Sequence, residues 1–140
     1  MKVTDLMIGD WIQVKRGLNG HLTNEKIKGL IDDDTEPYPI TLATGETVSL
    51  KDVVLIPLTE DILAKNFGGY DHIDYDKEAR LPCYFVGNRR VFVDSIMDKG
   101  HCFYFCHKDD WAGLHDIEIH YVHQLQHLLR LCSIEKEIEL

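Results

Sequence analysis

The sequence has no long apolar run and few basic residues. No stretch approaches the roughly 18 apolar residues of a membrane-spanning helix, and residues 1–5 lack the apolar segment and cleavage site of a signal peptide. The 140 residues carry 15 Lys and Arg against 24 Asp and Glu, giving a net charge of −9. We therefore expect a cytoplasmic protein without membrane contact. Nucleic acid is disfavoured as a partner, because an acidic surface repels phosphates.

Cysteine is scarce too, with four residues in the chain. In the absence of an export signal we expect reduced thiols. Two Cys and two His fall within residues 100–107, which resembles a zinc site. The run is aromatic, however, and predicts a strand, in which Cys102 and Cys106 are about 13 Å apart. That separation allows neither a shared metal ion nor a disulfide, so we expect two thiols facing the core.

The first part of the chain reads as short strands separated by turns, over residues 11–14, 26–31, 40–42, 47–50 and 53–56. They predict a small curled β-sheet or an SH3-like barrel over residues 1–57. A short linking helix should follow at residues 58–68, with Thr59 as its N-cap.

Residues 58–140 then predict a second α+β subdomain, packed with the first as one unit. Antiparallel strands are expected around 83–86 and 91–93, joined by a turn at Gly87, and again over 100–107. The overall fold class is therefore α+β. The final residues, 135–140, predict either a short last strand or a frayed end.

Two acidic clusters raise the question of metal binding. Residues 32–34 are three consecutive Asp, and four carboxylates fall between residues 71 and 78. Neither has the ligand spacing and glycine of a calcium loop. The first predicts a solvated turn, and the second an exposed edge or loop.

The hydrophobic period changes near the end of the chain. Residues 117–121 alternate as in a strand, whereas from Val122 onward the apolar residues take helical spacing. On this helix, His123 and His127 should share an exposed face opposite the apolar stripe. The motif HQLQH resembles the zinc-protease pattern, but Gln124 replaces the Glu that acts as general base. A solvent-facing polar pair is the favoured interpretation, with His123 and His127 as metal-site candidates.

Three segments carry a family resemblance: residues 5–11 (DLMIGDW), 56–63 (IPLTEDIL) and 121–128 (YVHQLQHL). They resemble a family of small proteins from Bacteroidetes genomes and their phages. That family has a DLRIGNW-like start, an IPLTEE centre and a YVHQLQNLYFALTG-like end. The resemblance implies a cytoplasmic bacterial or prophage protein without an assigned activity. His127 stands where the family has Asn, so a typical member would lack one histidine of the pair.

These observations leave three functional hypotheses. The chain shows no phosphate-binding loop and no nucleophile–base constellation, so we favour a non-enzymatic protein-interaction module that needs no cofactor. Its exposed aromatic candidates are Trp11, Tyr70 and Trp111. The first alternative is a metal-dependent hydrolase using His120, His123 and His127. The second is a nucleic-acid-binding phage protein.

Overall fold

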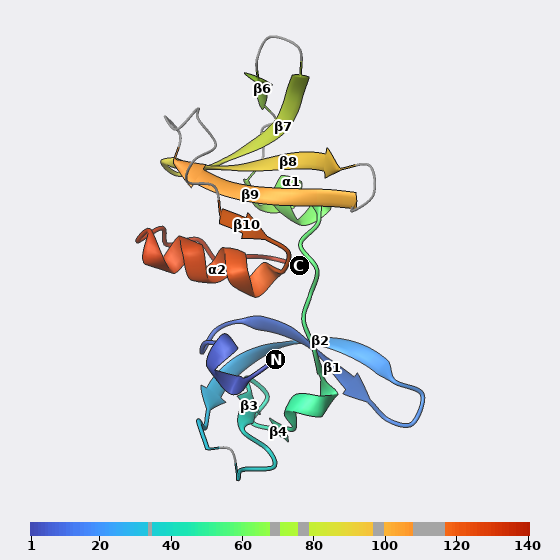
Figure 1. The fold of residues 1–140 in the computed structure, drawn as a ribbon. Coiled ribbons are helices and arrows are strands. Elements are labelled where there is room, and N and C mark those ends of the chain that lie inside the picture. Colours follow the sequence, from blue (N-terminus) through green and yellow to red (C-terminus); the bar gives the residue numbers. More distant parts are fainter. Residues whose placement is uncertain (34, 68–70, 76–78, 97–99, 108–116) are drawn as a thin grey trace. The chain divides into compact units, whose positions relative to one another are not determined.

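The computed structural model describes residues 1–33, 35–67, 71–75, 79–96, 100–107 and 117–140. The chain divides into two compact units, Met1–Ile56 (unit 1) and Pro57–Leu140 (unit 2). The sequence placed this division after residue 57. Within the described residues, each unit holds a five-stranded antiparallel sheet, and two α-helices belong to unit 2 (Figure 1). The predicted α+β class is therefore confirmed.

Unit 1 is built from short strands in the order β4-β3-β2-β1-β5. A 3-10 helix, η1 (Val3–Asp5), precedes them, and a second, η2 (Leu50–Asp52), lies between β4 and β5. The strands are β1 (Trp11–Arg16), β2 (His21–Leu30), β3 (Ile40–Leu42), β4 (Thr47–Val48) and β5 (Val53–Val54). All five were predicted. β2 begins earlier than expected, because residues 21–25 pair with β1 although they are mostly polar.

The core of unit 1 follows from the alternation of its strands. Ile12 and Val14 point inward from β1, and a register shift after Ile27 bends β2 so that Leu30 still faces Ile40. A shared apolar cluster results, formed by Leu6, Ile12, Val14, Ile27, Ile40, Leu42, Val48 and Val53.

The turn at residues 9–10 is fixed by backbone hydrogen bonds to β2. Gly9 adopts φ 90°, and its N–H donates to the Ile27 carbonyl at 2.7 Å. The Ile27 N–H returns a bond to the Asp10 carbonyl at 2.9 Å. The buried Asp10 carboxylate accepts the Met7 N–H at 2.8 Å. Glycine suits this place, because L-residues rarely adopt such a φ.

Unit 2 begins with α1 (Glu60–Phe67), whose predicted N-cap is confirmed: Thr59 Oγ1 accepts the Ile62 N–H at 3.3 Å. The sheet runs in the order β10-β9-β8-β7-β6. Its strands are β6 (Asp71–Tyr75), β7 (Ala79–Val86), β8 (Arg89–Ile96), β9 (Gly100–His107) and β10 (Ile117–Ile119). The acidic segment predicted as an exposed edge or loop thus contributes an edge strand, β6. The chain ends with α2 (Val122–Leu131) and a tail.

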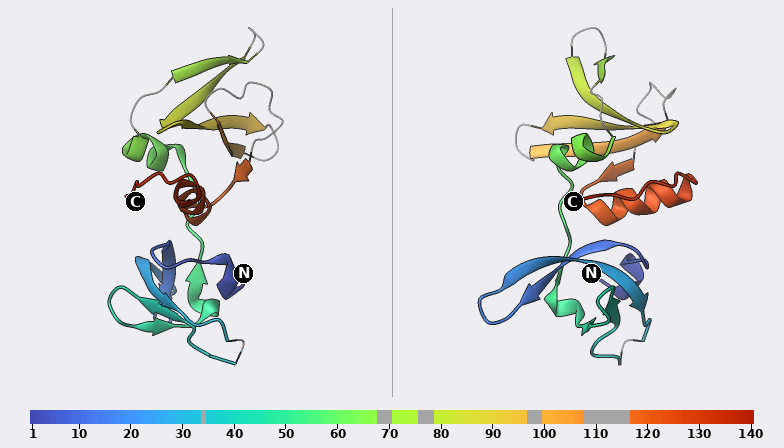
Figure 2. Two further views of the ribbon diagram at one scale, coloured as in Figure 1. Left: turned by 90° about the vertical axis from the view of Figure 1, so that its left-hand side faces the viewer. Right: turned by 180° about the vertical axis from the view of Figure 1, so that it is seen from behind.

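The two faces of this sheet bury different sets of residues, and the cysteines lie on one of them. One face is aliphatic and aromatic, and both helices lie on the same side of the sheet (Figure 2). Its buried members are Tyr84, Val86, Val91, Val93, Phe103, Phe105 and Ile119. The opposite face buries Cys83, Phe92 and Cys106 with Tyr104 beside them. Cys102 and Cys106 are both buried thiols, as predicted.

α2 ends in a Schellman motif. Ser133 N–H donates to the Arg130 carbonyl at 3.0 Å, and Ile134 N–H donates to the Leu129 carbonyl at 2.9 Å. The residue that makes this reversal possible is Ser133, at φ 55°. Glycine usually occupies that position.

The tail beyond the motif is neither a strand nor frayed, so both predictions for it are wrong. Ile138 is fully buried. Ile134 packs near Gly87, where an added Cβ would lie 3.4 Å from the Ile134 side chain. The tail is held by two isoleucines, Ile134 and Ile138. Two apolar residues are too few to show the periodicity of a strand or a helix.

Candidate functional site

The histidine motif first serves to begin a helix. Gln124 Oε1 accepts two backbone N–H groups, from His120 at 2.8 Å and from Tyr121 at 3.1 Å. Both donors precede the first helical hydrogen bonds, so the side chain satisfies groups that a helix start leaves open. The residue at the position of a catalytic Glu is therefore a capping residue.

The aromatic rings of Tyr121, His123 and His127 contact one another in sequence beside this cap. Tyr121 stacks on His123 with centroids 5.8 Å apart and 24° between the planes. His123 meets His127 edge to face at 5.5 Å. His120 lies before the helix, and its Nε2 is 3.5 Å from Glu118 Oε1. The structure thus brings the two predicted histidines together.

The predicted exposure of His123 is wrong. Its side chain is 5% exposed, and Gln126 on the same side of α2 is buried as well. The prediction required that the whole side of α2 opposite its apolar stripe face solvent. Here α2 is buried on more than its stripe, and stacking on Tyr121 covers one face of the imidazole.

A metal centre would need more ligands than this pair supplies. Catalytic zinc takes three protein ligands. Among the described residues, no group of three or more His, Cys, Asp or Glu side chains is placed to hold a metal ion. His120 does not join the pair on the helix, because α2 begins at Val122. The described geometry therefore offers two imidazoles and no coordination site.

Of the aromatic side chains predicted as a binding surface, only one is described. Trp11 is half-buried on β1, and Lys26 Nζ lies 5.6 Å from its ring centroid. This distance fits a cation–π contact between neighbouring strands. Tyr70 and Trp111 fall outside the described residues.

A different site emerges in unit 1. A pocket of about 250 Å³ lies between η1, η2 and the loop that joins β2 to β3. Its apolar lining includes Val3, Pro39 and Leu50. Its charged lining comprises three carboxylates, Asp32, Asp33 and Glu36, against the Lys2 side chain and the amino group of Met1. The pocket thus combines apolar surface with an excess of negative charge.

Hydrogen bonds hold the described residues of the acidic loop beside this pocket. Asp33 Oδ1 accepts the Thr35 N–H at 2.8 Å and the Thr35 hydroxyl at 2.7 Å. These bonds, the hydroxyl bond foremost, lower the pKa of Asp33 below its ordinary value. Glu36 Oε1 accepts the Tyr38 N–H at 3.0 Å. At the base of the loop, the Ile31 N–H donates to the Pro39 carbonyl at 2.8 Å.

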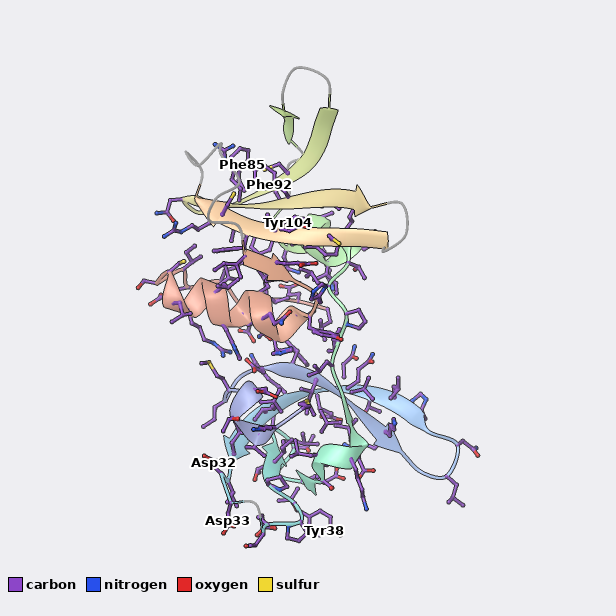
Figure 3. All side chains as sticks on the ribbon, in the orientation of Figure 1. Asp32, Asp33, Tyr38, Phe85, Phe92 and Tyr104 are labelled. Carbon is purple, nitrogen blue, oxygen red and sulfur yellow. The ribbon has the colours of Figure 1, made fainter. Side chains whose placement is uncertain are left out.

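Large apolar side chains on the same loop face solvent. Ile31 is 49% exposed and Tyr38 is 54% exposed, at the two ends of the acidic segment. Figure 3 shows Asp32, Asp33 and Tyr38 projecting from this loop. Exposed apolar side chains mark binding surfaces where they form contiguous patches, and these two flank the acidic residues that line the pocket.

The sequence predicts a solvated turn at residues 32–34 but does not predict the pocket. Asp32 and Asp33 are indeed exposed, while residue 34 lies outside the described residues. The signal available in the sequence was the flanking of four acidic residues by Ile31 and Tyr38. The contribution of η1 and η2 is tertiary and has no local signature.

Comparison with known proteins adds no family assignment. No family model, curated protein or solved structure matches the chain. In the described part of the chain, no helix has the length and apolar character needed to cross a membrane.

Proposed function

We propose that this protein is a non-enzymatic protein-interaction module of a bacterial or prophage cytoplasm. Unit 1 binds an extended segment of another protein that carries Lys or Arg beside aliphatic residues. The observation that carries this proposal is the pocket, in which Val3, Pro39 and Leu50 meet three carboxylates. Apolar contact supplies affinity, and opposite charge supplies orientation and rate of association.

We further propose that unit 1 is an SH3-like barrel. The strand order β4-β3-β2-β1-β5, with a 3-10 helix before β5, supports this assignment. Folds of this kind host many unrelated functions, so the proposed activity rests on the pocket and not on the fold.

The alternatives receive less support from the described residues. A hydrolase would need a third ligand beside His123 and His127. A nucleic-acid-binding protein would need a basic patch, whereas the charged surface at the pocket is acidic.

A peptide titration tests the proposal. One probe repeats Lys-Pro-Leu, and the second repeats Glu-Pro-Leu at the same length. Amide NMR shifts of the full chain are followed at ~0.15 M salt, where surface charges are screened within about 8 Å. We expect the basic peptide to shift residues of the acidic loop and the acidic peptide to leave them unchanged.

Two matched double variants localise the binding. Asp33→Asn with Glu36→Gln removes two pocket charges while the amide oxygens can still accept the loop's hydrogen bonds. Glu60→Gln with Asp61→Asn removes the same charge from α1. The pocket variant should bind the basic peptide at least about fivefold more weakly than the α1 variant. Equal affinity of the two variants, or binding of both peptides, would show that the pocket does not recognise a basic segment.

A further inference from the structure

The tail of the chain occupies a second site in unit 2, on α1. Ile138 is fully buried, and the residue after it pairs with the Asn66 side chain. Asn66 Nδ2 donates to the Glu139 carbonyl at 2.7 Å, while Asn66 Oδ1 accepts the Glu139 N–H at 2.8 Å. Lys65 Nζ donates to the Leu140 carbonyl.

The chemistry of this contact is that of strand pairing. A neighbouring strand satisfies one N–H and one C=O of the residue it faces, and the Asn66 amide does the same for Glu139. Asn66 is itself held in place, because Nδ2 also donates to the Ile62 carbonyl at 2.8 Å and the side chain is buried. Asn66 thus recognises backbone groups of Glu139, and the Ile138 side chain beside them is buried.

Any extended peptide with these features could make the same contacts, whether it belongs to the same chain or to another. We propose that α1 carries a binding site for an extended peptide with an aliphatic residue directly before the residue that pairs with Asn66. The tail fills this site within its own chain. When that tail is displaced, the same segment of a second copy binds in its place.

The tether explains why the site stays filled. A tail on a short linker is present at its site at roughly millimolar effective concentration. A second copy at micromolar concentration competes poorly with it. The intact chain should therefore bind an added tail peptide weakly, and loss of the anchoring isoleucine should open the site.

The experiment uses a fluorescent peptide with the sequence of residues 133–140. Fluorescence anisotropy measures its binding to the full chain and to the full-length variant Ile138→Asp. We expect binding to Ile138→Asp to be at least about tenfold tighter than to the unchanged chain. Adding Asn66→Ala to this variant should weaken the binding by about tenfold or more. A peptide of residues 133–140 that carries the change Ile138→Asp should not bind.

Folding is controlled by far-UV circular dichroism, with Ile138→Ala as a milder second receptor. A folded receptor variant that does not bind the peptide overturns the proposal. Peptide binding that is insensitive to Asn66→Ala does so as well. If neither Ile138 variant folds, the tail is an inseparable part of the core and not an exchangeable ligand, which also overturns it.

Discussion

Replacing Ser133 with glycine should stabilise the protein. Ser133 holds φ 55° at the end of α2. This left-handed conformation costs an L-residue about 1–2 kcal/mol, and glycine escapes that cost. Glycine also has more freedom in the unfolded chain, which offsets about 0.4–1 kcal/mol. The expected net gain for Ser133→Gly is therefore about 0–1.6 kcal/mol in the free energy of unfolding, with a central value of about 0.8 kcal/mol.

Urea unfolding followed by far-UV circular dichroism measures this gain, with midpoints compared at equal slope. Ser133→Ala is the matched control, because it removes the hydroxyl but retains the unfavourable φ. We expect the alanine variant to remain within about 0.5 kcal/mol of the unchanged chain. If Ser133→Gly is no more stable than Ser133→Ala, the left-handed backbone does not limit the stability of α2.

Three further predictions concern α2 and the acidic loop. Leu129→Ala should lower the free energy of unfolding by about 2–5 kcal/mol because the side chain is buried. Leu131→Ala, the same change at a side chain 76% exposed, should cost less than about 0.5 kcal/mol in the same urea experiment. Gln124→Ala should cost about 0.5–2 kcal/mol because two N–H groups lose their acceptor, and Gln124→Glu should restore most of it; equal losses would contradict the capping role. Thr35→Val should raise the pKa of Asp33 towards its ordinary value, since the hydroxyl bond is its main cause. Carboxyl NMR titration measures this pKa. Because the pKa of Asp33 is lowered in the folded state, the bond to Thr35 stabilises the folded protein at pH values above the unfolded-state pKa. This stabilisation is lost as the pH falls through the folded-state pKa.

The sequence located most elements because their signals are local. Gly87, at φ 63°, closes the β7–β8 hairpin where a turn was expected. The change of period at Val122 marks the start of α2. The spacing of apolar residues shows which side of a strand or helix is buried. It can therefore be read from the sequence without knowing which element packs against that side.

The features that the sequence missed depend on contacts between distant segments. The burial of His123 cannot be read from a helical wheel, because the wheel identifies the most apolar side but not whether others are covered. The Asn66–Glu139 pairing joins residues 73 positions apart. The pocket beside Asp33 needs η1 and η2, which contribute side chains from far along the chain.

In unit 2, contacts between its first residues and the start of α2 bear on how the protein folds during synthesis. Leu58 N–H donates to the His120 carbonyl at 2.8 Å, and Pro57 bridges to Tyr121. Contacts between residues so far apart must overcome a large loop-closure entropy before they contribute, so they form late. The sheet of unit 1 needs nothing beyond Val54. On the ribosome, unit 1 can therefore reach its native pairing early, whereas unit 2 must wait for nearly the whole chain to emerge.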